Sequence, residues 1–335
     1  MTKLPENDAI QLAEAVMNGD RRALARAITL VESARGDHRR DADALLEALA
    51  GSGRQAIRIG LSGTPGVGKS TFIEAFGCQL ADNGLRVAVL AVDPSSARTG
   101  GSILGDKTRM ERLARHKNAF IRPSPSQTQL GGVARRTRDV VALTEAAGFD
   151  IVLIETVGVG QSETIVAEMS DLFVLLLAPA GGDELQGVKR GIMEIADLVL
   201  VNKADGDLKA TAVRTVADYA GALRLMRKRQ GDPEGFPKAM PVSALENDGL
   251  SDAWEAMQIL VDHRRKTGFW DSRRAEQARK WFADEVHQGL LRRLTSDPKA
   301  EAAMASLAEA VASGSRAPGA AAAEVLAQLT AKGES

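Results

Sequence analysis

The 335-residue chain has a single cysteine and only four histidines, which are scattered singly along the sequence. Cys78 therefore has no partner in the chain for a disulfide or a thiolate metal site. We expect it to be a small, buried hydrophobic residue. The same scarcity excludes metal sites that depend on clusters of Cys and His at ligand-like spacing.

Aromatic residues make up only 4% of the chain, and its formal net charge is −1. Neither value favours binding to nucleic acid, which needs positive charge and often aromatic stacking. The longest apolar run, residues 172–180, is too short to cross a membrane. Residues 1–20 contain acids and lack the basic start and apolar run of a signal peptide. We therefore expect a cytoplasmic protein with no nucleic-acid or membrane partner.

With 44% hydrophobic and 26% charged residues, the chain can bury a sizeable core, and it exceeds one average domain. The patterns predict a helical N-terminal arm at residues 1–53, a main domain at 54–267 and a helical C-terminal extension at 268–335. The extension has few ways to bury its apolar stripe by itself, so we expect it to form a homodimer contact, with packing back on the main domain as the alternative. The stripe consists of Trp281, Phe282, Val286, Leu290 and Leu294.

Strand and helix patterns alternate through the main domain, as is typical of a parallel sheet with crossover helices. Seven strands are predicted, at residues 56–63, 86–93, 119–122, 151–156, 172–178, 198–202 and 239–243. Residues 208–229 are predicted as one helix, whose last turns collect basic residues that suit the helix dipole. A basic run in the helix predicted at residues 133–147 is expected to be a solvated face, with contact to an acidic partner as the alternative: Arg135, Arg136 and Arg138.

A glycine-rich loop after the first predicted strand carries the P-loop pattern G-x-x-x-x-G-K-S. Its glycines let backbone N–H groups turn onto one phosphate, toward which the next helix points its positive end. Lys69 is expected to reach the β- and γ-phosphates, and the Ser70 hydroxyl to hold Mg²⁺. We therefore predict an α/β fold: a P-loop NTPase with a doubly wound, mostly parallel sheet and helical extensions at both ends. The predicted phosphate-binding residues are Gly63, Thr64, Pro65, Gly66, Val67, Gly68, Lys69, Ser70 and Thr71.

The sequence Asn-Lys-Ala-Asp at residues 202–205 directly follows a predicted strand and indicates which base is bound. A carboxylate at Asp205 can accept hydrogens from both N1 and N2 of guanine, whereas adenine has no such pair of donors. Asn202 and Lys203 are expected to hold the base and brace the loop. These residues predict GTP and GDP as ligands. The loop at the next strand end is expected to complete the guanine pocket through Ser243, Ala244 and Leu245.

Two of the apolar strands end in the acids Asp93 and Glu155. Ligands of doubly wound sheets bind at the carboxyl ends of strands, so both carboxylates are expected beside the phosphates, where Mg²⁺ prefers oxygen ligands. Asp106, in a glycine-rich loop, is a third candidate, so the predicted metal ligands are Ser70, Asp93, Asp106 and Glu155. The predicted catalytic residues are Lys69, Asp93 and Gln161. The residue that positions the attacking water stays open, with Gln161, Glu163 and Asp93, the last acting through a bound water, as candidates.

Two loops are candidates for a rearrangement that follows the state of the nucleotide. Residues 155–158 occupy the place of a D-x-x-G switch, with glutamate in place of aspartate and Gly158 sensing the γ-phosphate. Gln161, just beyond, is a candidate for orienting water. In the second loop, at residues 181–189, Gln186 and Lys189 either reach across to a partner or belong to an ordinary helix cap.

Taken together, these stretches resemble the MeaB/ArgK family of P-loop GTPases. The resemblance rests on residues 63–71, 91–96, 99–110, 122–125, 155–163, 182–187 and 202–205 and is dense between 56 and 205. It implies a homodimeric GTPase chaperone of adenosylcobalamin-dependent acyl-CoA mutases, chiefly methylmalonyl-CoA mutase. Members couple GTP hydrolysis to delivery of intact cofactor and to protection of the mutase. No tightly held organic cofactor is expected in this chain itself.

The resemblance also implies that the loop with Gln186 and Lys189 is a switch that contacts the mutase, and that the C-terminal helices form the dimer. Two other functions are weighed against it. A nickel-insertion GTPase would need the Cys and His clusters that this chain lacks. An ATPase or kinase associated with basic amino acid transport would have no use for a guanine-selecting Asp205.

Overall fold

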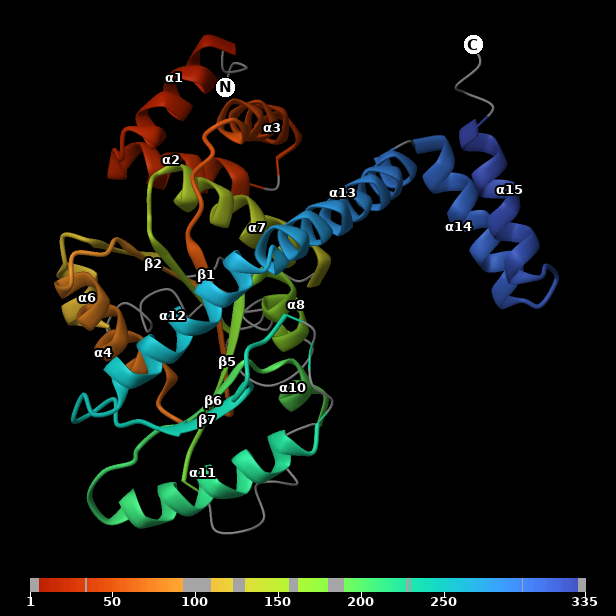
Figure 1. Cartoon of the computed structure of the whole chain (residues 1–335). Coiled ribbons are helices and arrows are strands. Elements are labelled where there is room, and N and C mark those ends of the chain that lie inside the picture. The colour runs from red at the N-terminus through yellow and green to blue at the C-terminus, as the bar shows by residue number, and fades with distance from the viewer. Residues whose placement is uncertain are drawn as a thin grey trace. The chain divides into compact units, whose positions relative to one another are not determined.

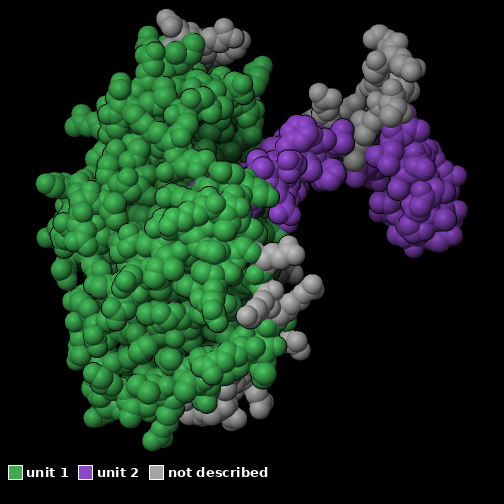
Figure 2. Space-filling view, in the orientation of Figure 1, with its two compact units in different colours: residues 1–272 green, residues 273–335 purple. Residues whose placement is uncertain are grey.

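The computed structural model describes residues 6–33, 35–92, 110–122, 130–156, 162–179, 190–226, 229, 231–296 and 298–330. The chain divides into two compact units, Met1–Ser272 and Arg273–Ser335 (Figure 2). Six predicted site residues lie outside the described residues: Asp93, Asp106, Gly158, Gln161, Gln186 and Lys189.

The first unit is built around a seven-stranded sheet in which every neighbouring pair of strands is parallel (Figure 1). The strand order is β3-β2-β4-β1-β5-β6-β7. The predicted α/β fold with a parallel sheet is therefore confirmed. Continuous apolar runs predict such a sheet because they suit strands that are covered on both faces. The strands are β1 (Ile57–Ser62), β2 (Val87–Val92), β3 (Ala119–Arg122), β4 (Ile151–Thr156), β5 (Leu172–Leu177), β6 (Leu198–Val201) and β7 (Lys238–Pro241).

Helices cover both faces of this sheet, as the alternation of side chains along β1 shows. Ile59 and Leu61 belong to the core that the sheet shares with α4 (Lys69–Asp82) and α12 (Leu250–Lys266). Gly60 points the other way, and a Cβ there would lie 2.5 Å from Ser170 Oγ, just beyond α8 (Ser162–Met169). The sheet is therefore doubly wound, with α8 in close contact on its second face.

The strand order places a topological switch point at β1. This strand lies between β4 and β5, and the chain leaves it toward β2 on one side and later continues to β5 on the other. In open α/β sheets, ligands bind beyond the carboxyl ends of strands at such a point. The loop after β1 is the predicted P-loop, so the fold puts it where a ligand is expected.

The N-terminal arm consists of α1 (Glu6–Met17), α2 (Arg21–Glu32) and α3 (Gly36–Ala50) and belongs to the first unit. Its middle helix, α2, packs on α7 (Leu130–Ala146). Arg21 Nη1 donates to the backbone oxygen of Lys117 at 3.0 Å, and Arg54 Nη1 donates to those of Met17 and Ala146 at 2.6 and 2.9 Å. The arm is thus fixed to the sheet by hydrogen bonds as well as by apolar packing.

Two expectations about basic residues are wrong. The run in α7 is not a solvated face: its arginines are partly buried, and Nε and Nη1 of Arg136 are enclosed. Burial lowers the pKa of Arg136, against the opposing charge of Glu32. The reason is that α2 covers this part of α7, which the sequence periodicity of α7 alone does not reveal.

The helix predicted at residues 208–229 is also shorter than expected, because α11 (Lys209–Arg224) ends at Arg224. Arg229 lies beyond it and pairs with Asp197 at 2.8 Å. Its Nη2 also donates to the backbone oxygens of Glu194 and Ala196 at 2.6 and 2.7 Å. These tertiary contacts replace the helix-dipole interaction that the sequence suggested.

Buried ion pairs close the amino end of the sheet. Arg264 of α12 is only 4% exposed. Its Nη2 contacts Asp197 Oδ1 at 2.6 Å and Asp232 Oδ1 at 2.7 Å. Its Nη1 donates to the backbone oxygen of Asp171 at 2.7 Å. Asp197 Oδ2 accepts from the backbone N–H of Phe173 at 2.7 Å. The end of α12 is therefore tied to the residues that directly precede β5 and β6.

The elements that remain are short or lie in the second unit. Cys78, in α4, is buried, as predicted.

None of the helices among the described residues is long and apolar enough to cross a membrane. The short helices of the first unit are α6 (Glu111–Arg115), α10 (Arg190–Ile195) and η2 (Gly206–Leu208), and α13 (Phe269–Ser296) leads from it into α14 (Pro298–Ala312) and α15 (Pro318–Thr330).

Candidate nucleotide-binding site

The P-loop connects β1 to α4 and needs glycine for two separate reasons. At Gly63, a Cβ would lie 2.4 Å from the backbone oxygen of Leu176, so the loop passes β5 too closely for any side chain. Gly68 has a φ of +87°, and a Cβ there would lie 2.7 Å from Asn202 Nδ2. Because α4 begins at the next residue, the loop delivers the positive end of a 14-residue helix to the site.

Lys69 sits at the start of α4 with its ammonium group turned back over the loop. Its Nζ donates to the backbone oxygens of Gly63 at 2.7 Å and Thr64 at 3.4 Å. Burial lowers the pKa of Lys69, and the charge of Glu155 opposes that change. The lysine is therefore partly desolvated and near a carboxylate, which places a strong charge where phosphate oxygens would bind.

Asn202, the first residue after β6, joins two loops that are far apart in the sequence. Its Nδ2 donates to the backbone oxygen of Val67 in the P-loop at 2.9 Å, and its Oδ1 accepts from the N–H of Ala244 at 3.1 Å. The side chain is buried, so these bonds are shielded from water. Asn202 consequently fixes the loop at residues 202–205, which is predicted to select the base, relative to the P-loop.

The carboxylate of Asp205 is oriented by its neighbours rather than left to rotate. Ser243 Oγ donates to Asp205 Oδ2 at 2.5 Å and accepts from the backbone N–H of Glu246 at 3.0 Å. Lys203 Nζ donates to the backbone oxygen of Gly66 at 2.7 Å, which braces this loop against the P-loop. One carboxylate oxygen is thereby committed to the protein, and the group retains the acceptors that guanine N1 and N2 hydrogens require.

Glu155 and Thr156 end β4 beside the carboxyl end of β1. Glu155 pairs in register with Leu61 and is buried. The hydroxyl of Thr156 lies 3.2 Å from Ser62 Oγ, directly before the P-loop. The start of the predicted switch loop is therefore held against the start of the phosphate loop.

The structure gathers the described members of the predicted site around the carboxyl ends of β1, β4, β6 and the segment after β7. The lysine of the P-loop, Glu155, Asn202, Asp205 and Ser243 all take part in this arrangement. Leu245 does not point into a closed pocket, because its side chain is 77% exposed. Thr156 belongs to the predicted switch stretch at residues 155–158, whereas Ser62 is outside the predicted site, and only its position directly before the P-loop could have suggested it.

Comparisons with known proteins give a consistent result. A family profile described as "Methylmalonyl Co-A mutase-associated GTPase MeaB" matches residues 24–299. A probable GTPase of Mycobacterium tuberculosis H37Rv is 50% identical over 315 residues, which cover 94% of this chain and 93% of that protein. The mitochondrial methylmalonic aciduria type A homolog of Mus musculus is 45% identical over 322 residues, which cover 93% of this chain and 77% of that protein.

The fold agrees with these sequence relatives. The crystal structure of an LAO/AO transport system kinase superposes with a TM-score of 0.74 and 34% identity, and the match covers 98% of this chain and 100% of that one. Its similarity extends over both units, so the helical extensions as well as the sheet have counterparts in a solved structure.

Proposed function

The chain belongs to the MeaB family of methylmalonyl-CoA mutase-associated GTPases, and on that premise we propose that it couples GTP hydrolysis to adenosylcobalamin loading and protection of methylmalonyl-CoA mutase or a related acyl-CoA mutase. The protein is a GTPase. The observation that carries the choice of nucleotide is the Asp205 carboxylate, which Ser243 orients while Asn202 anchors its loop to the P-loop.

We assign the chemistry of the site as follows. Lys69 and the N–H groups of the P-loop bind the β- and γ-phosphates, and Asp205 with the loop at residues 243–245 binds guanine. The ammonium group of Lys69 is partly desolvated, so it stabilises the negative charge that develops on the γ-phosphate during its transfer to water. Asp93 and Gln161, outside the described residues, stay candidates for placing that water.

The described side chains suit Mg²⁺, which takes oxygen ligands and usually keeps several waters. Ser70 follows Lys69 in the first turn of α4, and the buried carboxylate of Glu155 is close enough to act on the pKa of that lysine. Ser70 and Glu155, with Asp93 and Asp106, would hold the ion, which would neutralise phosphate charge there.

The proposed coupling predicts that the state of the nucleotide changes the affinity for the mutase. We propose that the loops with Gly158, Gln161, Gln186 and Lys189 report that state to the partner. The purified chain should bind a cobalamin-dependent methylmalonyl-CoA mutase with affinities for the GTP-analogue and GDP forms that differ about tenfold, within the usual range of allosteric coupling. Calorimetry with each nucleotide measures this, and absorbance of the cobalamin follows its transfer.

A P-loop variant, Lys69→Ala, provides the control, because it should bind the mutase with one affinity whichever nucleotide is added. If the wild-type chain neither binds the mutase nor alters its cofactor loading, the chaperone function is rejected, whatever its rate of GTP hydrolysis.

We further propose that the second unit is covered by another copy of the chain. On α13, Phe282, Val286 and Leu290 are exposed at intervals of four residues, with Phe282 72% exposed. Such spacing puts them on one face of the helix, and an exposed apolar stripe is typical of an interaction surface. The substitution of Phe282 and Leu290 by Asp should therefore yield monomers, as measured by sedimentation velocity.

The matched control is Gln288→Asp, which adds a charge at an exposed polar position of the same helix. That variant should sediment as the wild type does. Dimers that persist with both apolar residues replaced would show that the contact lies elsewhere.

The similarity to an LAO/AO transport system kinase supports one alternative, an ATP-dependent activity associated with transport. Asp205 disfavours it, because adenine would leave that carboxylate without donors. The nickel-insertion alternative has no supporting cluster: among the described residues no three His, Cys, Asp or Glu side chains gather as a metal site.

A further inference from the structure

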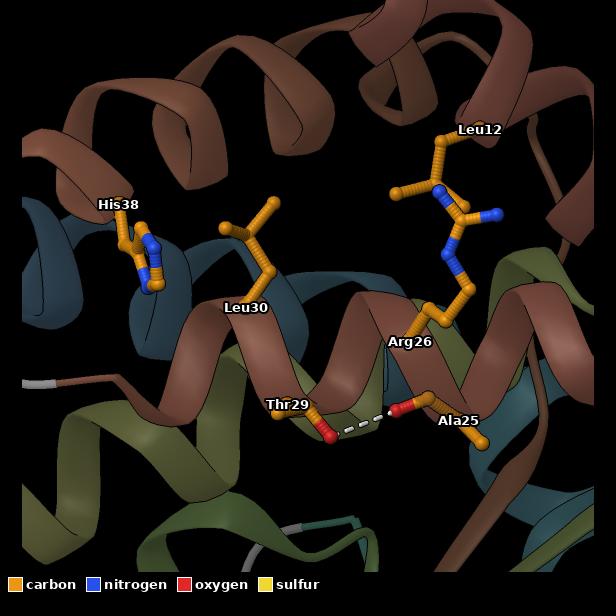
Figure 3. Close-up of a pocket in the computed structure, with 6 residues that line it drawn as sticks. All are labelled: Leu12, Ala25, Arg26, Thr29, Leu30 and His38. Carbon is orange, nitrogen blue, oxygen red and sulfur yellow. Dashed lines mark hydrogen bonds between the residues drawn. The ribbon is translucent and has the colours of Figure 1, made fainter. Parts of the chain in front are cut away.

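The N-terminal arm contains a hollow of about 400 Å³ that the nucleotide site does not use. Leu12 of α1, His38 of α3 and four residues of α2 line it (Figure 3). The buried stripe of α2 includes Leu24 and Ile28, so the residues that line the hollow lie on the opposite face of this helix. The four from α2 are Ala25, Arg26, Thr29 and Leu30.

The lining combines an apolar floor with a cation. Figure 3 shows Leu30 and Arg26 rising from α2 and Leu12 facing them from α1. None of the described residues that line the hollow is an acid, and Arg26 makes no hydrogen bond or ion pair with the part of the chain that the structure describes. The charge of Arg26 does act on Asp20, but that carboxylate is engaged as the N-cap of α2, accepting from the N–H groups of Arg22 and Ala23.

The polar groups of the hollow therefore favour an acidic occupant. Thr29 Oγ1 already donates to the backbone oxygen of Ala25 at 3.0 Å, and His38 Nδ1 lies 2.8 Å from Ser33 Oγ. The guanidinium of Arg26 is the group left to pair with a new anion, and carboxylates are its best partners. The apolar floor beside it suits one large aliphatic side chain.

Ion pairs hold the N-terminal arm in a fixed position on the sheet and its helices. Glu32, at the end of α2, pairs with Arg122 of β3, and Arg39 of α3 pairs with Asp139 of α7 at 3.3 Å. A molecule bound to the arm is therefore held in a defined position relative to the sheet. That property matters for a partner whose binding must respond to the nucleotide at the carboxyl end of the same sheet.

We propose that this hollow is a docking site for the mutase, occupied by a segment that presents a large aliphatic side chain next to an Asp or Glu. The inference rests on the proposed function, since it places that partner on the arm. A protein segment fits better than a small free ligand, because the hollow is open at the surface and offers few polar groups to orient a small molecule.

The test measures binding of three variants to purified cobalamin-dependent methylmalonyl-CoA mutase by calorimetry. Arg26→Glu should weaken binding about 30-fold or more, because it replaces a charge pair by a repulsion. Leu30→Gln should weaken it about tenfold by removing the apolar floor. Arg22→Glu is the control: it reverses a charge one turn earlier on α2, outside the lining. It should bind within about threefold of the wild type.

All three variants should retain the wild-type rate of GTP hydrolysis and melting temperature, since these side chains are partly or fully exposed. Unchanged binding by Arg26→Glu, or equal weakening by Arg22→Glu, overturns the docking site while leaving the chaperone function in place. A wild-type chain that does not bind the mutase rejects both. A change in the mass of Arg26→Glu alone in sedimentation assigns the hollow to a second copy instead and overturns the proposal.

Discussion

Replacing Asp205 by Asn is expected to move the preference of the site from guanine to xanthine nucleotides. A carboxylate accepts hydrogens from N1 and N2 of guanine, but an amide has only one accepting atom and places an N–H group against the guanine N2 donor. Xanthine carries an oxygen at that position and keeps the N1 hydrogen, so it matches the amide. Loss of two charge-assisted hydrogen bonds, at about 1.5–3 kcal/mol each, should weaken GTP binding by about two to four orders of magnitude.

The Asp205→Asn substitution should leave the surrounding hydrogen bonds in place. Ser243 Oγ donates to Asp205, but a hydroxyl both donates and accepts, so it can serve the amide as well. Asn202 holds the loop through bonds that the substitution does not touch. Fluorescence titration with labelled GDP and XDP measures the two affinities of each variant.

Asp207→Asn is the matched control, because Asp207 is an exposed acid two residues along the same loop. It should leave both affinities within about twofold of the wild type. An Asp205→Asn variant that still prefers GDP would show that another group selects the base, and would reopen the ATP-dependent alternative.

Removing the charge of Arg264 should cause a large loss of stability. Its burial would lower its pKa, but Asp197 and Asp232 outweigh that effect and hold the pKa above its ordinary value, so the guanidinium stays charged. Arg264→Met leaves both acids without this partner. Breaking a buried ion pair on one side costs about 3–5 kcal/mol, which for the first unit corresponds to a fall in Tm of roughly 10 °C.

Of the two acids, Asp232 depends more on Arg264 for compensation of its charge. Its Oδ1 contacts Arg264, and its Oδ2 is buried with no hydrogen-bond partner among the described residues. Asp197 keeps Arg229 and the backbone N–H of Phe173. The addition of Asp232→Asn to Arg264→Met should therefore recover part of the lost stability, since one uncompensated charge is removed.

Urea unfolding followed by circular dichroism measures these differences in the free energy of unfolding. Arg115→Met is the control: Arg115 pairs with Glu111 at 3.7 Å on an exposed helix face, and its loss should cost less than about 0.5 kcal/mol. If Arg264→Met and Arg115→Met cost the same, the buried network does not stabilise the amino end of the sheet.

The strands and the P-loop could be predicted because their signals are local. Seven apolar runs with polar ends specify a parallel sheet, and the position of Asp205 just after β6 follows once that sheet is assumed. The bonds that make Asp205 useful could not be predicted in this way. They join Asn202 to Val67 across 135 positions and to Ala244 across 42, distances over which periodicity carries no information.

The two wrong expectations have the same cause. The arginines of α7 have the spacing of a solvated face until α2 is placed over them, and Arg229 suits the end of a helix until Asp197 is placed beside it. In both cases a tertiary partner overrides a local preference. Charged residues are the hardest to place from sequence, because the same arginine serves in water or in a buried pair.

The two bonds of the Asn202 side chain also limit how this site can be re-engineered. Because one asparagine holds the phosphate loop and the loop after β7 together, residues 202–205 do not form a portable cassette. If the corresponding four residues were grafted from another nucleotide-binding protein, the grafted asparagine would lack its two hydrogen-bond partners. These partners are a backbone carbonyl in the phosphate loop and a backbone N–H in the loop after the last strand. A successful graft has to bring all three loops as one part, whereas a single exchange at Asp205 keeps the frame intact.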